Sequence, residues 1–298
     1  MLSVKPWKTE AMLRLLASVF VCLYAGSLLL LTLHHDDKAR VGTGFYLLLV
    51  GALGCSAAAL VCLHRPWTLE RIMRHLAAFL IFFYGGLLLG AFAQKLAGSP
   101  GPSVAQMVIG AVSFQGAVVL LAGRFVREHQ VTWSEAFGFG NRRRLAIVLG
   151  FCLACGFVWL GTALQAVSVA AMEAASKRLP GLHLKPEAQQ AVQTLQATTG
   201  WGARLLLGVV TILLAPMGEE ILFRGLLYPW IKQAGYPRLA LWGTVALFAL
   251  IHLNLETFLP LAVLALALTM LYEWTDNLLA PVAAHALFNA LNFARALT

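Results

Sequence analysis

The sequence has too little charge to cover the outside of a soluble protein of its length. Only 12% of its 298 residues are charged and 60% are apolar, against about 25% and roughly 45–50% in ordinary soluble domains. The charged residues also stand between long apolar runs. This composition excludes a soluble α/β enzyme and a disordered chain, and it indicates a protein embedded in a lipid bilayer along most of its length.

Cysteine is also scarce, and its positions exclude a disulfide-stapled secreted domain. There are five cysteines, and all of them lie within apolar runs. An odd number of cysteines in hydrocarbon does not form a disulfide framework. Cys152 and Cys155 form a lone CxxC without a second pair, so helix packing is a better interpretation of them than metal or redox chemistry.

Basic residues outnumber acidic ones, giving a formal net charge of +9. The sequence nevertheless lacks a basic stretch interleaved with stacking aromatic residues, which nucleic-acid binding would favour. The lysines and arginines flank the apolar runs instead, as they do at the cytoplasmic ends of membrane helices. We therefore expect the lipid bilayer as a partner and no nucleic acid.

The apolar runs are long enough to cross a membrane, which takes about 20 mostly apolar residues. The last two candidates are closely spaced, so the sequence predicts an all-α fold, a polytopic transmembrane bundle of eight or nine helices. The candidate segments are 11–33, 44–64, 72–96, 104–124, 145–172, 201–228, 238–256, 258–274 and 278–296.

The order of these segments predicts an orientation and three parts. With the N-terminus in the cytoplasm, most of the 22 lysines and arginines fall on the cytoplasmic side, as the positive-inside rule requires. Residues 1–144 hold N-terminal membrane helices of unknown role. Residues 145–200 hold a connecting membrane helix and a polar loop, which is either a lid or a plain connection. Residues 201–298 hold the last four helices.

Four ionisable side chains interrupt the apolar runs of this last part from within. They are Glu219, Glu220, His252 and His285. Each costs a few kcal/mol or more to place in hydrocarbon, so a functional site is the default interpretation.

Helical spacing assigns different roles to the two glutamates. Glu220 and Arg224 are four residues apart and can form an ion pair on one helix face. Glu219 is turned by about 100° from Glu220, so it can face a cavity and serve as a general base. The alternative is that both glutamates share Arg224 and only hold helices together.

The histidines stand in similar spacings. His285 and Asn289 are four residues apart and share a face, and the ring of Phe248 can pack over His252 at the same spacing. No serine or cysteine stands with a histidine in a nucleophile arrangement. Water is therefore the expected nucleophile, with bases to activate it and donors for a developing oxyanion.

In chain order, these residues form three motifs in three membrane segments. The sequence resembles the CPBP intramembrane proteases, the CAAX protease and bacteriocin-processing family that is also called Abi. The resemblance covers roughly residues 200–295. The motifs are EExxxR from Glu219 to Arg224, FxxxH from Phe248 to His252, and HxxxN from His285 to Asn289.

The resemblance implies an intramembrane endopeptidase in the bacterial inner membrane, with its catalytic core in the last four helices, residues 201–298. Glu219 and His252 would activate the water, and His285 and Asn289 would form the oxyanion hole. The supporting residues would be Glu220, Arg224 and Phe248. The implied substrate is a peptide or protein in the membrane, such as a prenylated tail or a bacteriocin leader.

Two alternatives stay open. Glu219, His252 and His285 offer three zinc ligands and an open fourth position. Because HExxH is absent and asparagine is an uncommon zinc ligand, we expect no cofactor, with zinc as the alternative. The same buried polar cluster also suits a non-enzymatic transporter, scaffold or immunity protein, since intramembrane glutamate and histidine form proton relays.

Overall fold

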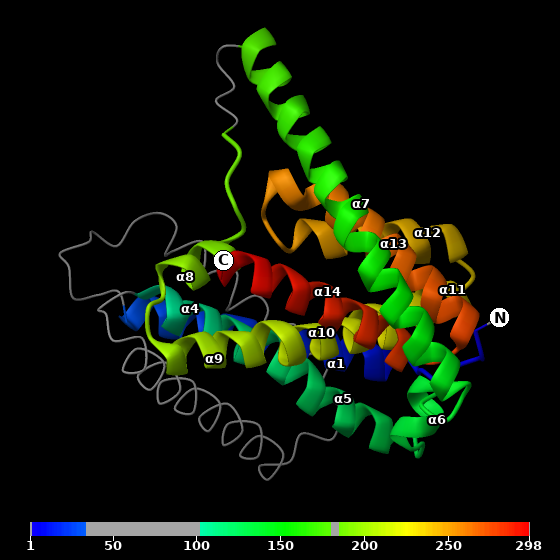
Figure 1. Ribbon diagram of the computed structural model, residues 1–298. Helices are drawn as coiled ribbons and strands as arrows, with labels where there is room; N and C mark the ends of the chain where they lie inside the picture. Colours follow the sequence, from blue (N-terminus) through cyan, green and yellow to red (C-terminus); the bar gives the residue numbers. More distant parts are fainter. Residues whose placement is uncertain (1, 34–101, 180–184, 298) are drawn as a thin grey trace. The chain divides into compact units, whose positions relative to one another are not determined.

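The computed structural model describes residues 2–33, 102–179 and 185–297, and these residues form helices joined by turns, without a strand among them (Figure 1). Five helical stretches are long and apolar enough to cross a membrane. They are Thr9–Ser27, Met107–Glu128, Arg143–Arg178, Trp201–Gln233 and Leu255–Thr275. The predicted all-α, polytopic helical fold is therefore confirmed. The predicted segments 44–64 and 72–96 lie outside the described residues.

The described chain divides into two compact units. One contains α1 (Thr9–Leu33), α4 (Pro102–Ala111), the π-helix η1 (Val112–Gly116), α5 (Ala117–Glu128) and α9 (Trp201–Val209). Here α1 packs against η1 and α5. The approach is close at Gly26, where a Cβ would lie 1.9 Å from the Ser113 Oγ, so only glycine fits there.

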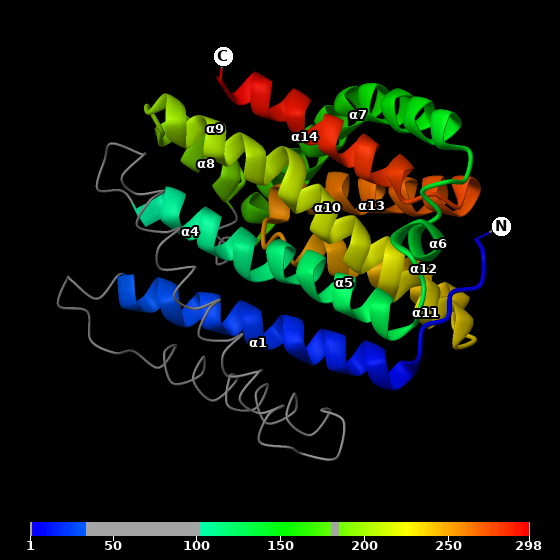
Figure 2. The ribbon, with the colours of Figure 1, turned by 90° about the horizontal axis from the view of Figure 1, so that it is seen from below.

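The other unit contains every predicted site residue. Its helices α7, α13 and α14 pack along one another, and α12 packs between α11 and α13 (Figures 1 and 2). At Gly150 of α7, a Cβ would lie 2.6 Å from the Ala280 carbonyl oxygen, which keeps α7 close to α14. The elements are α6 (Trp133–Phe137), α7 (Arg143–Arg178), α8 (Gln190–Ala197), α10 (Ala215–Glu220), the π-helix η3 (Ile221–Leu227), α11 (Tyr228–Gln233), α12 (Pro237–Leu250), α13 (Leu255–Thr275) and α14 (Leu279–Leu297).

Two of the predicted segments differ in length or composition from a membrane span. In place of segment 238–256, α12 has 14 residues, or about 21 Å of helix, which is shorter than the hydrocarbon core of a bilayer. Consequently His252 lies in the turn after α12 and not within a helix. Segment 278–296 forms the expected helix, α14, but α14 is not among the five candidate spans.

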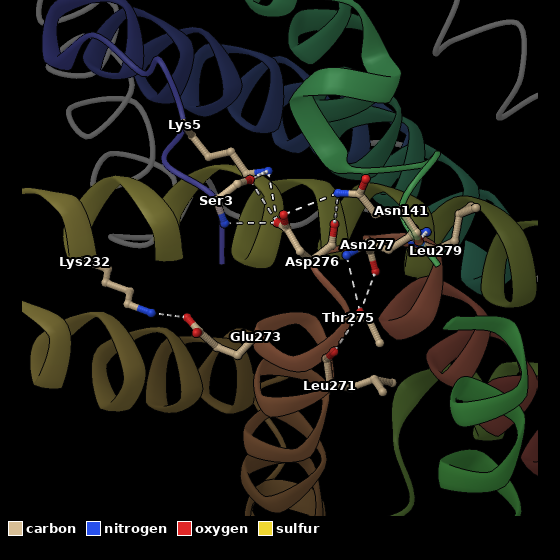
Figure 3. A network of polar contacts seen from close by, with 10 residues as sticks. All are labelled: Ser3, Lys5, Asn141, Lys232, Leu271, Glu273, Thr275, Asp276, Asn277 and Leu279. Atoms are coloured by element: carbon tan, nitrogen blue, oxygen red, sulfur yellow. Dashed lines mark hydrogen bonds and ion pairs between the residues drawn. The ribbon is translucent and has the colours of Figure 1, made fainter. Parts of the chain in front are cut away.

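A polar network holds the turn between α13 and α14 (Figure 3). Asp276 ends α13 in the left-handed region, at φ 47°. Its carboxylate accepts a hydrogen bond from the Ser3 hydroxyl at 3.0 Å and from the Asn141 amide at 3.4 Å, and forms an ion pair with Lys5 at 3.5 Å. Two segments that are far apart in sequence, the N-terminal one and the one at Asn141, are thereby tied to one turn.

Asn277 fixes the direction in which α14 leaves that turn. Its Oδ1 accepts from the backbone N–H of Leu279 at 2.9 Å, and its Nδ2 donates to the Asn141 carbonyl at 2.5 Å (Figure 3). Asn277 is fully buried. Because α14 starts at Leu279 and carries His285, these bonds orient the helix that brings His285 to Glu220.

Candidate active site

The first part of the site is a buried ion pair within one helical stretch. Glu220 ends α10 and Arg224 lies in η3, and the Arg224 Nη1 is 2.9 Å from the Glu220 Oε1. Both residues are buried, Glu220 at 0% and Arg224 at 1% exposed. The ion pair expected from their four-residue spacing is therefore present.

Arg224 is also fixed by two neighbouring helices. Its Nη2 donates to the Ala265 carbonyl at 2.9 Å, and its Nε donates to the Thr269 hydroxyl at 3.4 Å, both on α13. Its guanidinium lies 4.6 Å from the centre of the Phe248 ring on α12, within the range of a cation–π interaction. A buried arginine with this many partners is a rigid anchor for Glu220.

His285 joins this pair from α14. Its Nδ1 lies 2.9 Å from the Glu220 Oε1, so one carboxylate oxygen accepts from both His285 and Arg224. Because an ionised carboxylate only accepts hydrogen bonds, the Nδ1 of His285 carries a proton. The Nε2 on the other side of the ring lies 4.0 Å from the Glu219 Oε2, and both of these side chains are buried.

The bond between His285 and Glu220 is the part of the site that sequence reasoning missed. The two residues are 65 positions apart and lie in different helices, so helical spacing carries no signal for their contact. Glu220 is thus more than the counter-ion of Arg224, because it also sets the tautomer and the orientation of His285.

His252 stands in the turn between α12 and α13. Its Nδ1 lies 2.7 Å from the Phe248 carbonyl oxygen. A carbonyl oxygen only accepts, so the Nδ1 carries the proton and the Nε2 of the neutral ring has the free lone pair. His252 therefore has the tautomer of a base that acts through Nε2.

The turn that carries His252 is held in place from both sides. Leu253 follows at φ 48°, a left-handed conformation that costs about 1–2 kcal/mol in a non-glycine residue and reverses the chain. Asn254 then caps α13, accepting from the Thr257 N–H at 2.9 Å, and donates to the Glu187 carbonyl at 2.7 Å. The polar loop that was predicted as a lid or a connection thus contacts the turn beside His252.

Phe248 connects the two histidines. Its ring centre lies 5.1 Å from that of His252 and 5.7 Å from that of His285, and it also forms an edge contact with Phe223 at 5.4 Å. The side chain is fully buried. The phenyl ring is therefore the common packing surface of both imidazoles and of the Arg224 guanidinium.

Replacing Phe248 by leucine is expected to destabilise the protein by about 2 kcal/mol, because the cation–π contact and the ring pairs are lost together. Thermal melting in detergent measures this. The control is Phe258→Leu, at a half-buried residue of α13. Equal melting temperatures for the two variants would contradict the role given to Phe248.

Asn289, one helical turn after His285, is bonded to a backbone carbonyl. Its Nδ2 donates to the Thr211 oxygen at 2.9 Å. One of its two amide N–H groups is therefore engaged, and the other can be offered to a ligand. The structure thus gives Asn289 a fixed orientation that the sequence did not predict.

The zinc alternative would require Glu219, His252 and His285 to lie around one point. Among the residues that the structure describes, no three or more His, Cys, Asp or Glu side chains form a group that could hold a metal ion. The expectation of no cofactor, with zinc as the alternative, stays a prediction that chelation tests.

Comparisons with known proteins agree with the resemblance seen in the motifs. Residues 201–291 match the family of type II CAAX prenyl endopeptidase Rce1-like proteins, and this segment contains all seven predicted site residues. The uncharacterized protein YpbD of Bacillus subtilis (strain 168) is 33% identical over 86 residues, which are 28% of this chain and 41% of that protein. The matched region thus spans less than half of this relative. No solved structure matches the chain.

Proposed function

We propose that this chain is an intramembrane endopeptidase of the CAAX type that hydrolyses a peptide bond with an activated water. The observation that carries the proposal is the buried series Arg224–Glu220–His285, with the Glu219 carboxylate 4.0 Å from the free side of the His285 ring. It lies within the segment that matches the Rce1-like family.

The proposed first step is the attack of water on the scissile carbonyl carbon. Glu219 takes one proton of the water as it attacks, and the Nε2 of His252 accepts a hydrogen bond from the same water and so orients it. When the tetrahedral intermediate collapses, the C–N bond breaks and the same proton passes to the leaving amine. Water thus supplies a hydroxyl to the new carboxyl end and a hydrogen to the new amino end.

The developing oxyanion needs hydrogen-bond donors. The tautomer of His285 determines which of its ring nitrogens can donate to the oxyanion. Its Nδ1 proton is already donated to Glu220, so His285 donates from Nε2 only as an imidazolium. The Glu220 carboxylate stabilises that cation, as a buried carboxylate does for a histidine in other hydrolytic sites. The second amide N–H of Asn289 supplies the other donor.

A farnesylated peptide with a CAAX-type end tests the substrate class. Purified protein in liposomes is incubated with this peptide or with the same peptide lacking the isoprenoid, and the products are analysed by mass spectrometry. Cleavage that depends on the isoprenoid supports the proposal. If the farnesylated peptide stays intact, the proposed CAAX-type substrate is wrong. An intact peptide is the result that a transporter, scaffold or immunity protein would give.

Chelation tests the metal-free chemistry. Extensive treatment with a chelator is expected to leave turnover unchanged, because Glu219 and His252 activate the water without a metal ion. Elemental analysis of the purified protein is expected to give well under one equivalent of zinc. Turnover that is lost to the chelator and restored by zinc would overturn this assignment in favour of a zinc site.

A further inference from the structure

The helix that carries the two glutamates changes its hydrogen-bond register just before them. Residues Val210–Leu214 form a π-helix, and α10 follows from Ala215. In a π-helix the carbonyl of residue i accepts from the N–H of residue i+5. For Thr211 that residue is Pro216, which has no N–H. In the same register, the acceptor expected for the N–H of Ala215 is the carbonyl five residues earlier and not that of Thr211.

The Thr211 carbonyl, which lacks a donor from its own helix, accepts a hydrogen bond from Asn289 instead. The Asn289 Nδ2 lies 2.9 Å from the Thr211 oxygen. This bond fixes the plane of the amide, and with it the direction of the second N–H. Pro216 is buried and stands three residues before Glu219 in α10. The same short helix therefore carries the proposed base and the proline next to the carbonyl that binds Asn289.

We propose that Pro216 is a positioning residue for Asn289: by lacking an N–H, it leaves the Thr211 carbonyl free to accept from the amide and so aims the second N–H at the oxyanion. This inference rests on the proposed function, because it assigns the aim of an oxyanion donor. An N–H at position 216 would compete for the Thr211 carbonyl and weaken its hydrogen bond to the amide.

The test is a double-mutant cycle with Pro216→Ala and Asn289→Ala. Pro216→Ala restores the N–H and is expected to lower kcat by about tenfold. This loss is smaller than that caused by removing an oxyanion donor, because the donor is misdirected and not absent. KM is expected to stay unchanged, because the oxyanion forms only in the transition state. In the Asn289→Ala background, measured at high enzyme concentration, Pro216→Ala is expected to change kcat less than twofold.

The chain offers a matched control in Pro229. It is also buried, and it is also the second residue of an α-helix that follows a π-helix, here α11 after η3. Pro229→Ala restores an N–H in the same backbone setting without involving Asn289, and it is expected to leave kcat unchanged. Detergent melting shows that each variant is folded, and Pro216→Ser restores the same N–H if the alanine variant does not fold.

Each outcome decides the inference. A fall in kcat that disappears in the Asn289→Ala background supports it. An equal fall in both backgrounds, a rise in KM alone, or the same fall for Pro229→Ala would show that Pro216 acts only on the fold. A folded wild type without turnover on the peptides would instead refute the proposed function, on which the inference depends.

Discussion

Glu219→Gln is expected to lower turnover by about a thousandfold, within the range for loss of a general acid–base group, while the protein melts like the wild type. Glutamine keeps the shape of the side chain but cannot take a proton from water. The ion pair of Arg224 is with Glu220, so it survives the change. Turnover of a cleaved peptide and melting in detergent are measured together.

The matched control is Glu173→Gln, the same substitution at an exposed residue of α7. It is expected to change neither turnover nor melting. Near-normal turnover of Glu219→Gln would show that the base has been assigned to the wrong residue. A large loss of melting temperature in that variant would show that Glu219 serves the fold.

Glu220→Gln is expected to lower both stability and turnover. The Glu220 Oε1 accepts from Arg224 and from His285, and the side chain is fully buried. A glutamine retains an acceptor but not the charge, so Arg224 becomes a buried cation without its ion pair. Breaking such a pair costs about 3 kcal/mol or more, which is measured as a lower melting temperature.

Glu219→Gln is the natural comparison for this variant, because it makes the same change one residue earlier. The two variants are expected to differ in melting temperature, since Glu219→Gln affects turnover only and Glu220→Gln affects both turnover and melting. If Glu220→Gln melts like the wild type, the series Arg224–Glu220–His285 does not hold the helices together.

Sequence spacing predicted the contacts that one helical stretch makes with itself. Glu220 and Arg224 pair as expected because residues four apart are neighbours on a helix surface. Phe248 lies against His252 as expected from the same spacing, although His252 lies in the turn after the helix. The acidic and histidine residues also indicated the candidate site, because ionisable groups inside apolar runs are costly to place in a membrane without a function.

Contacts between helices and changes of helical register could not be predicted in this way. The bonds from His285 to Glu220 and from Asn289 to Thr211 depend on how α14 packs. Hydrophobic runs do not distinguish an α-helix from a π-helix, so the register change before Pro216 was not predicted. A signal for it was nevertheless present, since a proline inside a helical run leaves an earlier carbonyl without its donor.

The end of α12 could not be predicted from the apolar pattern either. Residues 238–256 are apolar enough to suggest one long segment, yet the helix ends at Leu250 and the chain turns at Leu253. Polar groups that are distant in sequence hold this turn, Asn254 through its bond to the Glu187 carbonyl. His252 therefore lies in a turn and not within a helix.

Quantitative peptidomics of membranes tests the central claim most directly. Membranes from cells that carry the wild type, Glu219→Gln or Glu173→Gln are compared at equal protein levels. We predict a set of cleaved membrane-associated peptides that appears with the wild type and with Glu173→Gln and is lost with Glu219→Gln, while its uncleaved precursors accumulate. Identical peptide sets from all three membranes would contradict the assignment of this chain as an intramembrane endopeptidase.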